Sequence, residues 1–185
     1  MDKVEIKPSA FIFPTPLTII TAYDEQGKPQ GFLNTWIMNA SKNPPTIAII
    51  TKRERCIFSS IIKQQCFGVN LISEELLEAA DYFGQMSGRE EDKFQKCNLS
   101  IVTGKVENVP LIKDCPINFE CKLVQQIDIA DTVMLIGEVK KGYLSKLILD
   151  ENGCPCDQLV KSVMHGLTHY LGVSYYIAPL GFSKK

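Results

Sequence analysis

The sequence lacks the short motifs that mark several large enzyme classes. No Gly-x-Gly-x-x-Gly segment follows a strand pattern, which argues against a Rossmann-type dinucleotide turn, and no Gly-x-x-x-x-Gly-Lys-Ser/Thr loop supports a P-loop nucleotidase. A Gly-x-Ser-x-Gly nucleophile elbow is also absent. The chain has two histidines in 185 residues, so catalysis by a histidine-rich metal centre is not expected.

The chain has little net charge and no long apolar run. Its formal charge is −1, with acidic and basic residues interspersed, so we expect neither nucleic acid nor a membrane as a partner. Residues 1–8 are charged, unlike a secretion signal, and apolar runs such as residues 46–50 are too short to cross a bilayer. With 45% apolar and 22% charged residues, we predict one globular, cytoplasmic domain over residues 1–185.

The seven cysteines are odd in number and scattered, which favours reduced thiols, most of them in the core, over a disulfide framework. His165 and His169 are about one helical turn apart, and with the nearby Cys154, Cys156 or Asp157 they could form a metal site. A glycine between the histidines weakens the helix assumption, so we interpret them as a surface or interface pair and predict no metal. The individual roles of the histidines and cysteines stay open.

Hydrophobic periodicity predicts a mainly β protein with short helices. Strands are expected over residues 17–23, 32–41, 46–51, 67–72, 101–109, 118–129 and 132–144, with turns at residues 24–29 and 150–153. Pro44 and Pro45 end the second strand, because proline has no N–H to donate. Apolar residues at helical spacing predict a helix over about residues 55–65. Ser73 is expected to cap a second helix that ends near Gly84, and residues 85–98 are expected to form a loop.

The basic segment 51–55 lies where a strand pattern changes to a helix pattern. A helix start offers unpaired amide donors, and basic side chains add charge-assisted hydrogen bonds, a combination that suits a phosphate group. The alternative is a solvated basic turn.

Two further segments are candidates for ligand binding. Residues 87–94 begin with Ser-Gly, which permits a close backbone approach, and contain Arg89 and Lys93 as donors; the alternative is an exposed loop of mixed charge. Residues 34–41 place the only tryptophan, Trp36, among polar groups, as an amphipathic ring such as a flavin requires. The alternative here is a strand with one polar face and a core tryptophan.

Taken in order, these segments and their neighbours resemble the flavin reductase-like family that includes flavoredoxin. The resemblance covers residues 13–139, most of the chain. The motifs that carry it are Thr21-Ala22-Tyr23-Asp24, Asn43-Pro44-Pro45, the basic segment 51–55, Phe67-Gly68-Val69-Asn70, Asp81-Tyr82-Phe83-Gly84, Ser87-Gly88, Asp92-Lys93-Phe94, Phe119-Glu120-Cys121-Lys122-Leu123 and Ile136-Gly137-Glu138-Val139.

The resemblance implies a split β-barrel of Greek-key type, a homodimer, and FMN bound near the dimer interface. Position by position, it implies contacts to the isoalloxazine ring from Thr35, Trp36, Asn39, Ala40 and Ser41. It implies contacts to the ribityl phosphate from Lys52, Arg53, Arg55 and Cys56. It implies further contacts from Asn70, Ser87, Gly88 and Lys93. No catalytic side chain is expected, because the flavin itself carries the chemistry.

The chain departs from the family pattern at two positions. Leu33 stands where members often have a hydroxyl residue, and Cys56, a weaker donor, stands where threonine is common. Weaker phosphate binding would make FMN a loosely held substrate.

The resulting hypothesis is an FMN-binding flavin oxidoreductase that uses NADH or NADPH. The rival is a non-catalytic, flavoredoxin-type carrier that passes electrons to a redox protein. The order of the motifs argues against a third reading, a barrel that binds another cofactor such as heme.

Overall fold

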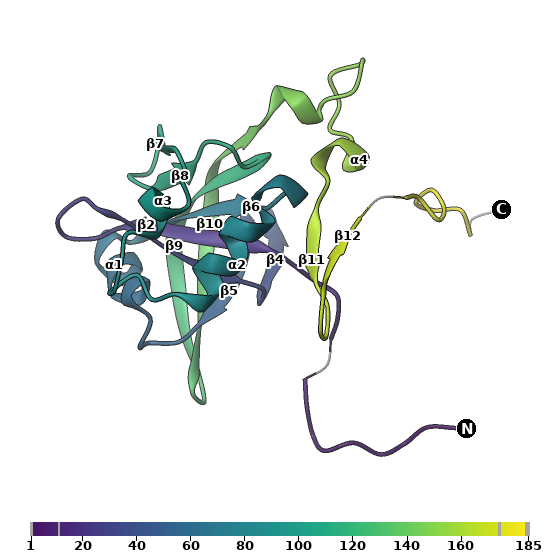
Figure 1. The fold of residues 1–185 in the computed structure, drawn as a ribbon, viewed down its shortest axis with the longest axis horizontal. Coiled ribbons are helices and arrows are strands. Elements are labelled where there is room, and N and C mark those ends of the chain that lie inside the picture. Colours follow the sequence, from purple (N-terminus) through teal and green to yellow (C-terminus); the bar gives the residue numbers. More distant parts are fainter. Residues whose placement is uncertain (1, 11, 174, 184–185) are drawn as a thin grey trace.

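The computed structural model describes residues 2–10, 12–173 and 175–183 and consists mainly of antiparallel strands (Figure 1). Within these residues, a seven-stranded sheet has the order β3-β2-β6-β9-β10-β5-β4. Its strands are β2 (Thr18–Tyr23), β3 (Pro29–Asn34), β4 (Ile37–Lys42), β5 (Pro45–Thr51), β6 (Cys66–Leu71), β9 (Ile117–Ile129) and β10 (Thr132–Leu144), each antiparallel to its neighbours.

The sheet closes on itself because its two edge strands follow one another in the chain. Thr35 and Trp36 alone separate β3 from β4, although these strands lie at opposite ends of the sheet order. Two hydrogen bonds to Ile50 of β5 join the edges. The Asn34 side-chain amide donates to the Ile50 carbonyl at 3.0 Å, and the Ile50 N–H donates to the Trp36 carbonyl at 2.9 Å. The predicted β-barrel is therefore confirmed.

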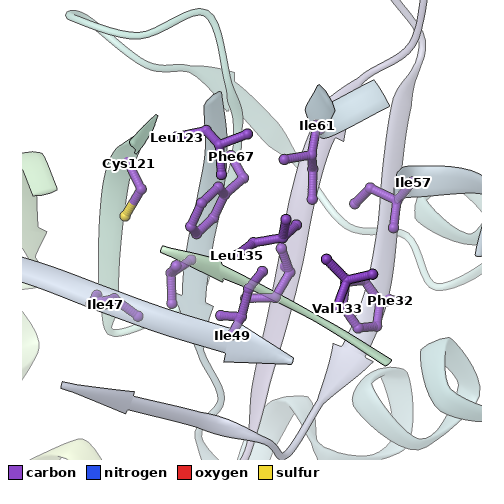
Figure 2. Packing of buried hydrophobic residues seen from close by; sticks show 13 residues of the cluster. Phe32, Ile47, Ile49, Ile57, Ile61, Phe67, Cys121, Leu123, Val133 and Leu135 are labelled. Carbon is purple, nitrogen blue, oxygen red and sulfur yellow. The ribbon is translucent and has the colours of Figure 1, made fainter. Parts of the chain in front are cut away.

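The barrel interior is filled by alternating side chains from the strands and by one helix. Figure 2 shows Phe67, Ile49 and Leu135, all fully buried, in the centre of this core. Helix α1 (Cys56–Gln64) adds Ile57 and Ile61 from one face, as their four-residue spacing predicts.

A second core lies on the outer side of β2 and β3. Strand β2 alternates, so that Ile20 points into the barrel and Ile19 packs outward. Helices α2 (Leu77–Gln85) and α3 (Lys93–Lys96) cover this outer face, and their rings Phe83 and Phe94 meet edge to face at 4.9 Å. This outer layer fixes the segment 86–92 that joins the two helices.

Shorter elements complete the described part of the chain. They are β1 (Thr15–Pro16), β7 (Ile101–Thr103), β8 (Pro110–Ile112), β11 (Val163–His165), β12 (Tyr170–Gly172), α4 (Asp157–Val160), η1 (Glu74–Leu76) and η2 (Lys146–Ile148). Strand β7 pairs with β8, and β11 lies between β1 and β12. None of the helices that the structure describes has the length and apolar character needed to cross a membrane.

Several sequence-based predictions need correction. The single strand over residues 32–41 is wrong, because the chain breaks at Thr35 and Trp36 to pass from one barrel edge to the other. The strand over residues 101–109 ends at Thr103, and residues 85–98 contain α3, whose start Asp92 caps by accepting from the amides of Phe94 and Gln95. Ser73 precedes η1 but makes no side-chain capping bond.

A buried carboxylate holds the connection between β7 and β8 against the barrel. Glu120 of β9 is fully buried and accepts hydrogen bonds from the backbone amides of Lys105, Val106 and Glu107 and from the Tyr143 hydroxyl. Burial by itself raises the carboxyl pKa, but these hydrogen bonds outweigh it and hold the pKa of Glu120 below its ordinary value. The ionised form therefore stabilises the fold.

We expect Glu120→Gln to lower the free energy of unfolding by about 2–4 kcal/mol at pH 7, because an amide N–H₂ replaces an acceptor among buried donors. The stabilisation by a carboxyl with a lowered pKa is complete above its unfolded pKa of about 4.3 and is lost as the pH falls through the folded pKa. The difference between variant and wild type should thus shrink below about pH 4, measured by urea unfolding at several pH values.

The control is Glu138→Gln, which removes a surface ion pair with Lys140 and should cost less than about 1 kcal/mol. Equal losses in the two variants, or a loss at Glu120 that stays constant with pH, would contradict the stabilising role of the ionised carboxylate.

Candidate functional site

A cavity of about 610 Å³ lies where the two edges of the barrel meet. Its wall is formed by the end of β3, the residues Thr35 and Trp36, the end of β5 and the turn between β9 and β10 at residues 129–132. We call it the barrel-edge cavity. Phe32 and Ile50 give it apolar surface, and Trp36, 55% exposed, stands at the barrel edge rather than in the core.

Two buried polar atoms in this wall lack a partner. Asn34 is 3% exposed and Thr51 is 4% exposed, and both line the barrel-edge cavity. Neither Oδ1 of Asn34 nor Oγ1 of Thr51 has a hydrogen-bond partner among the described residues. Leaving a buried polar atom unpaired costs about 1–3 kcal/mol, so such atoms next to a cavity indicate a polar ligand.

The basic side chains of the turn after β5 extend in two different directions. Lys52 pairs with Asp131 at 3.4 Å, and Arg53 pairs with Asp128 and lies over the Phe58 ring, so these two side chains reach toward the β9–β10 hairpin. Arg55 lies over the Phe32 ring, 5.0 Å from its centroid, and forms no ion pair within the described residues. Arg55 is therefore the cation available to a ligand at this turn.

A second cavity of about 310 Å³, which we call the loop cavity, adjoins the first through Lys52 and Arg55, which line both. Cys56 at the start of α1 and the loop Ser87, Gly88 and Arg89 form its other walls. The helix start and the cations give it a positive character.

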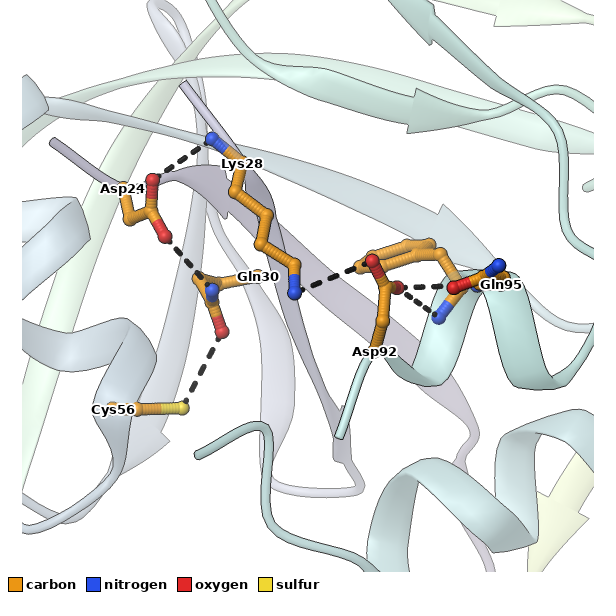
Figure 3. A network of polar contacts seen from close by, with 7 residues as sticks. Asp24, Lys28, Gln30, Cys56, Asp92 and Gln95 are labelled. Atoms are coloured by element: carbon orange, nitrogen blue, oxygen red, sulfur yellow. Dashed lines mark hydrogen bonds and ion pairs between the residues drawn. The ribbon is translucent and has the colours of Figure 1, made fainter. Parts of the chain in front are cut away.

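Gly88 lies close to two side chains at the edge of the loop cavity. A β-carbon at this position would lie 2.9 Å from Gln30 Oε1 and 3.2 Å from Cys56 Sγ. A side chain at residue 88 would therefore require the ends of the Gln30 and Cys56 side chains, which contact each other (Figure 3), to shift.

Lys93 connects the loop of residues 87–89 to the end of α2. Its side chain is buried, and its ammonium donates to the Phe83 carbonyl at 3.1 Å and to the Met86 carbonyl at 3.2 Å, at the end of α2. Burial lowers the pKa of Lys93 to about 8, so the group is still largely protonated at pH 7. Because it also lines the loop cavity, Lys93 adds positive charge there while it positions the loop.

The other predicted site residues lie elsewhere. Asn39, Ala40 and Ser41 are exposed on β4 and line neither cavity. Asn70 is fully buried, and its amide is used within the chain: Nδ2 donates to the Ile19 carbonyl at 2.9 Å, and Oδ1 accepts from the Ile112 N–H at 2.8 Å. The structure thus gives Asn70 a role in joining strands.

Among the wall residues that sequence reasoning left out of the predicted site are Phe32, Asn34 and Thr51, whereas Arg89 was named only as a donor of the candidate segment 87–94. Asn34 and Thr51 lie inside the segments that were singled out, but no sequence signal shows that their oxygens lack partners. Arg89 donates to the Glu54 carbonyl at 2.9 Å across the loop cavity, a contact that depends on the tertiary fold.

The two histidines do not share a helix face. His165 ends β11, and its ring contacts those of Phe13 and Tyr170 at 5.8 and 6.1 Å, whereas His169 lies in the turn before β12. Within the described ranges, no three His, Cys, Asp or Glu side chains gather in a way that could hold a metal ion.

Comparison with known proteins agrees with the observed fold. Residues 10–156 match the family described as "Flavin reductase like domain". The structure of flavoredoxin from Desulfovibrio vulgaris superposes with a TM-score of 0.92 at 26% identity, covering 99% of this chain and 100% of that one.

Two curated relatives are similar in sequence. An uncharacterized protein of Aeropyrum pernix is 31% identical over 133 residues, which cover 71% of this chain and 50% of that protein. A probable flavin reductase of Rhizobium meliloti is 28% identical over 127 residues, 69% of this chain and 39% of its own length. This chain therefore spans half or less of the length of these two relatives. The family match over most of the chain and the shared split-barrel architecture show that the chain belongs to the flavin reductase-like family.

Proposed function

We propose that this protein binds FMN and transfers electrons from NADH or NADPH to the flavin. The observation that carries the proposal is the pair of unpartnered, buried oxygens of Asn34 and Thr51 beside a cavity that continues into a cationic one. A flavin has a flat ring with a polar edge and an anionic tail. The ring matches the barrel-edge cavity, and the tail matches the cationic loop cavity.

The residues of the barrel-edge cavity fit the ring. The Asn34 and Thr51 oxygens would pair with polar atoms at the ring edge, and Phe32, Ile50 and Trp36 would supply apolar contact. Thr35 lines the same wall. The ring contacts of Asn39, Ala40 and Ser41 stay predictions.

The residues of the loop cavity fit the phosphate. Arg55 and Lys52 would supply charge, the first turn of α1 with Cys56 would supply amide donors, and Ser87 and Gly88 would close the opposite side. Arg53 would stabilise the turn from outside through Asp128 rather than hold the phosphate.

The bound flavin would supply the redox chemistry by accepting a hydride from the nicotinamide, which leaves as NAD(P)⁺. The chain's own residues would bind the flavin, orient it and shield it. The exposed Trp36 borders the open side, where a second reactant can approach.

A carrier function is the second candidate, and the likeness to flavoredoxin over the whole chain favours it. In that case the protein would exchange electrons with a redox protein and would not oxidise a nicotinamide.

We also propose a homodimer. Strand β4 is an edge strand, and next to the cavities it exposes Met38, 60% exposed, beside Trp36. Apolar side chains on an unpaired edge favour coverage by a second chain.

The function is tested with the visible spectrum of the dialysed protein and with NADH and NADPH oxidation in the presence of added FMN. We expect a flavin spectrum on addition of FMN and flavin-dependent oxidation of at least one donor. A protein that binds flavin but oxidises neither donor would be a carrier, and a protein that binds no flavin would refute the proposal.

The assignment of the phosphate to Arg55 predicts that Arg55→Gln raises the Kd for FMN about 10- to 100-fold, the value of a charge-assisted hydrogen bond, and leaves the Kd for riboflavin unchanged. Titration calorimetry measures both. The matched control is Arg53→Gln in the same turn, which should change neither Kd beyond about 3-fold. If Arg53→Gln weakened FMN binding as much as Arg55→Gln, the assignment of the phosphate to Arg55 rather than Arg53 would be wrong.

The dimer is tested by sedimentation equilibrium at micromolar concentration. Met38→Glu on β4 should convert a dimer to a monomer, because a carboxylate in a covered apolar face is strongly unfavourable. Val102→Glu, at an exposed position of β7, is the control and should remain dimeric. If the wild-type protein sedimented as a monomer, the dimer proposal would be wrong.

A further inference from the structure

Residues 175–183, which we call the C-terminal segment, lie away from the barrel at the yellow end of the ribbon in Figure 1. The large apolar side chains of this segment have exposed fractions between 60% and 105%; they are Tyr175, Tyr176, Ile177, Leu180 and Phe182. None of them belongs to a core cluster of the described residues. Because exposed apolar surface of this extent is unfavourable in water, we expect a second surface to cover it.

The second half of the C-terminal segment forms a tight turn. The Phe182 N–H donates to the Pro179 carbonyl at 3.2 Å, and Gly181, at the third position of the turn, has a φ of +79°. A positive φ at this position is typical of a type II β-turn. Leu180 occupies the corner of this turn and is fully exposed, so the turn presents an apolar side chain to a partner.

A third cavity, of about 230 Å³, lies on the outer side of the barrel. We call it the apolar cavity. Ala48 of β5 and Met134 of β10 line it, and both alternate along their strands with residues of the barrel core, so they point outward. Trp36 and Met38, each more than half exposed, form the edge of the wall, and residues 10–15 supply its remaining part. The thioether side chains can adapt to the shape of an apolar partner.

The apolar cavity adjoins the proposed flavin site. Thr35, Trp36 and Ile50 line both this cavity and the barrel-edge cavity, so the two meet where the chain passes from β3 to β4. A side chain seated in the apolar cavity would therefore pack against Trp36, which borders the proposed ring site.

The C-terminal segment of the same chain is not placed to fill this cavity. Figure 1 shows β11 and β12 between the segment and β4, so the segment would have to cross this pair of strands to reach the cavity. In a dimer with twofold symmetry, each copy can instead give its segment to the other copy and receive one in return.

We propose that the C-terminal segment of one copy docks into the apolar cavity of a second copy, with Leu180 as the side chain that enters it. The exposed apolar side chains of one segment amount to roughly 800 Å², so two segments together supply the ~1,600 Å² of a standard stable interface. The inference rests on the proposed homodimer and names the surfaces that form it. The partner copy then contributes a side chain beside the flavin site.

The test is Leu180→Asp in the full chain. We expect this variant to raise the Kd of the dimer at least about 10-fold, because a carboxylate loses its hydration in an apolar wall. Leu147→Asp is the matched control: Leu147 is 85% exposed in η2, lines none of the barrel-edge, loop and apolar cavities, and its substitution should change the Kd less than about 3-fold. Sedimentation equilibrium measures the Kd of all three proteins.

Trp36 is the only tryptophan of the chain, so its fluorescence reports directly on the apolar cavity. Emission measured without added flavin should lie at shorter wavelength in the dimer, where the segment excludes water from the indole. Leu180→Asp should emit at longer wavelength at concentrations where the wild type and Leu147→Asp are dimeric. A synthetic peptide of residues 175–183 should reverse this shift in a saturable way, and the same peptide with Leu180→Asp should not.

Three results would overturn the inference. If Leu180→Asp left the dimer Kd unchanged while Met38→Glu gave a monomer, the interface would not include the C-terminal segment, but the proposed dimer and flavin site would stand. If Leu180→Asp shifted the Trp36 emission without changing the association state, the segment would cover the cavity of its own chain. If the peptide failed to bind, the apolar cavity would not be its docking site. Flavin binding, read from the visible spectrum, tests the proposed function independently of all three.

Discussion

The main chain of Ile50 is hydrogen-bonded on both sides, and these contacts connect barrel closure with the proposed ligand site. Its N–H donates to the Trp36 carbonyl and its carbonyl accepts from the Asn34 amide, so the two edges of the sheet are joined at one residue of β5. Because Asn34 uses its nitrogen for closure, its oxygen is left without a partner in the wall of the barrel-edge cavity. The bond that closes the barrel thus also orients an acceptor that the closed chain cannot satisfy.

The turn that follows β5 likewise uses two of its charged side chains for contacts within the chain. Lys52 and Arg53 are paired by Asp131 and Asp128 of the β9–β10 hairpin, more than 70 residues later in the chain. Those pairs hold the turn against the hairpin but contribute little stability by themselves, since both partners are exposed. Lys52 and Arg55 line both neighbouring cavities, and of these two described cations Arg55, placed over Phe32, is the one without an ion pair.

Much of the architecture could be predicted from periodicity. The long strands β9 and β10, the buried strand β5 and helix α1 all follow from alternating or helical spacing, and the ordered motifs indicated the family. The break at Thr35 and Trp36 could not be predicted, because no proline or glycine marks it and closure across the sheet imposes it. Asn70 and Arg53 have partners set by the tertiary fold, so a motif alone could not separate a strand-joining amide or a hairpin-bound arginine from a ligand contact.

In the proposed flavin site, the ring and the tail would be bound by different elements. The barrel-edge cavity is built from strand ends whose hydrogen bonds close the barrel, so substitutions there disturb the fold as well as the ligand. The loop cavity is built from the start of α1 and a loop that Lys93 connects to the end of α2. Several of its side chains, Ser87 and Arg89 among them, are exposed and outside the core. In the proposed site, contacts to the flavin phosphate could therefore change through surface positions while the barrel stays the same.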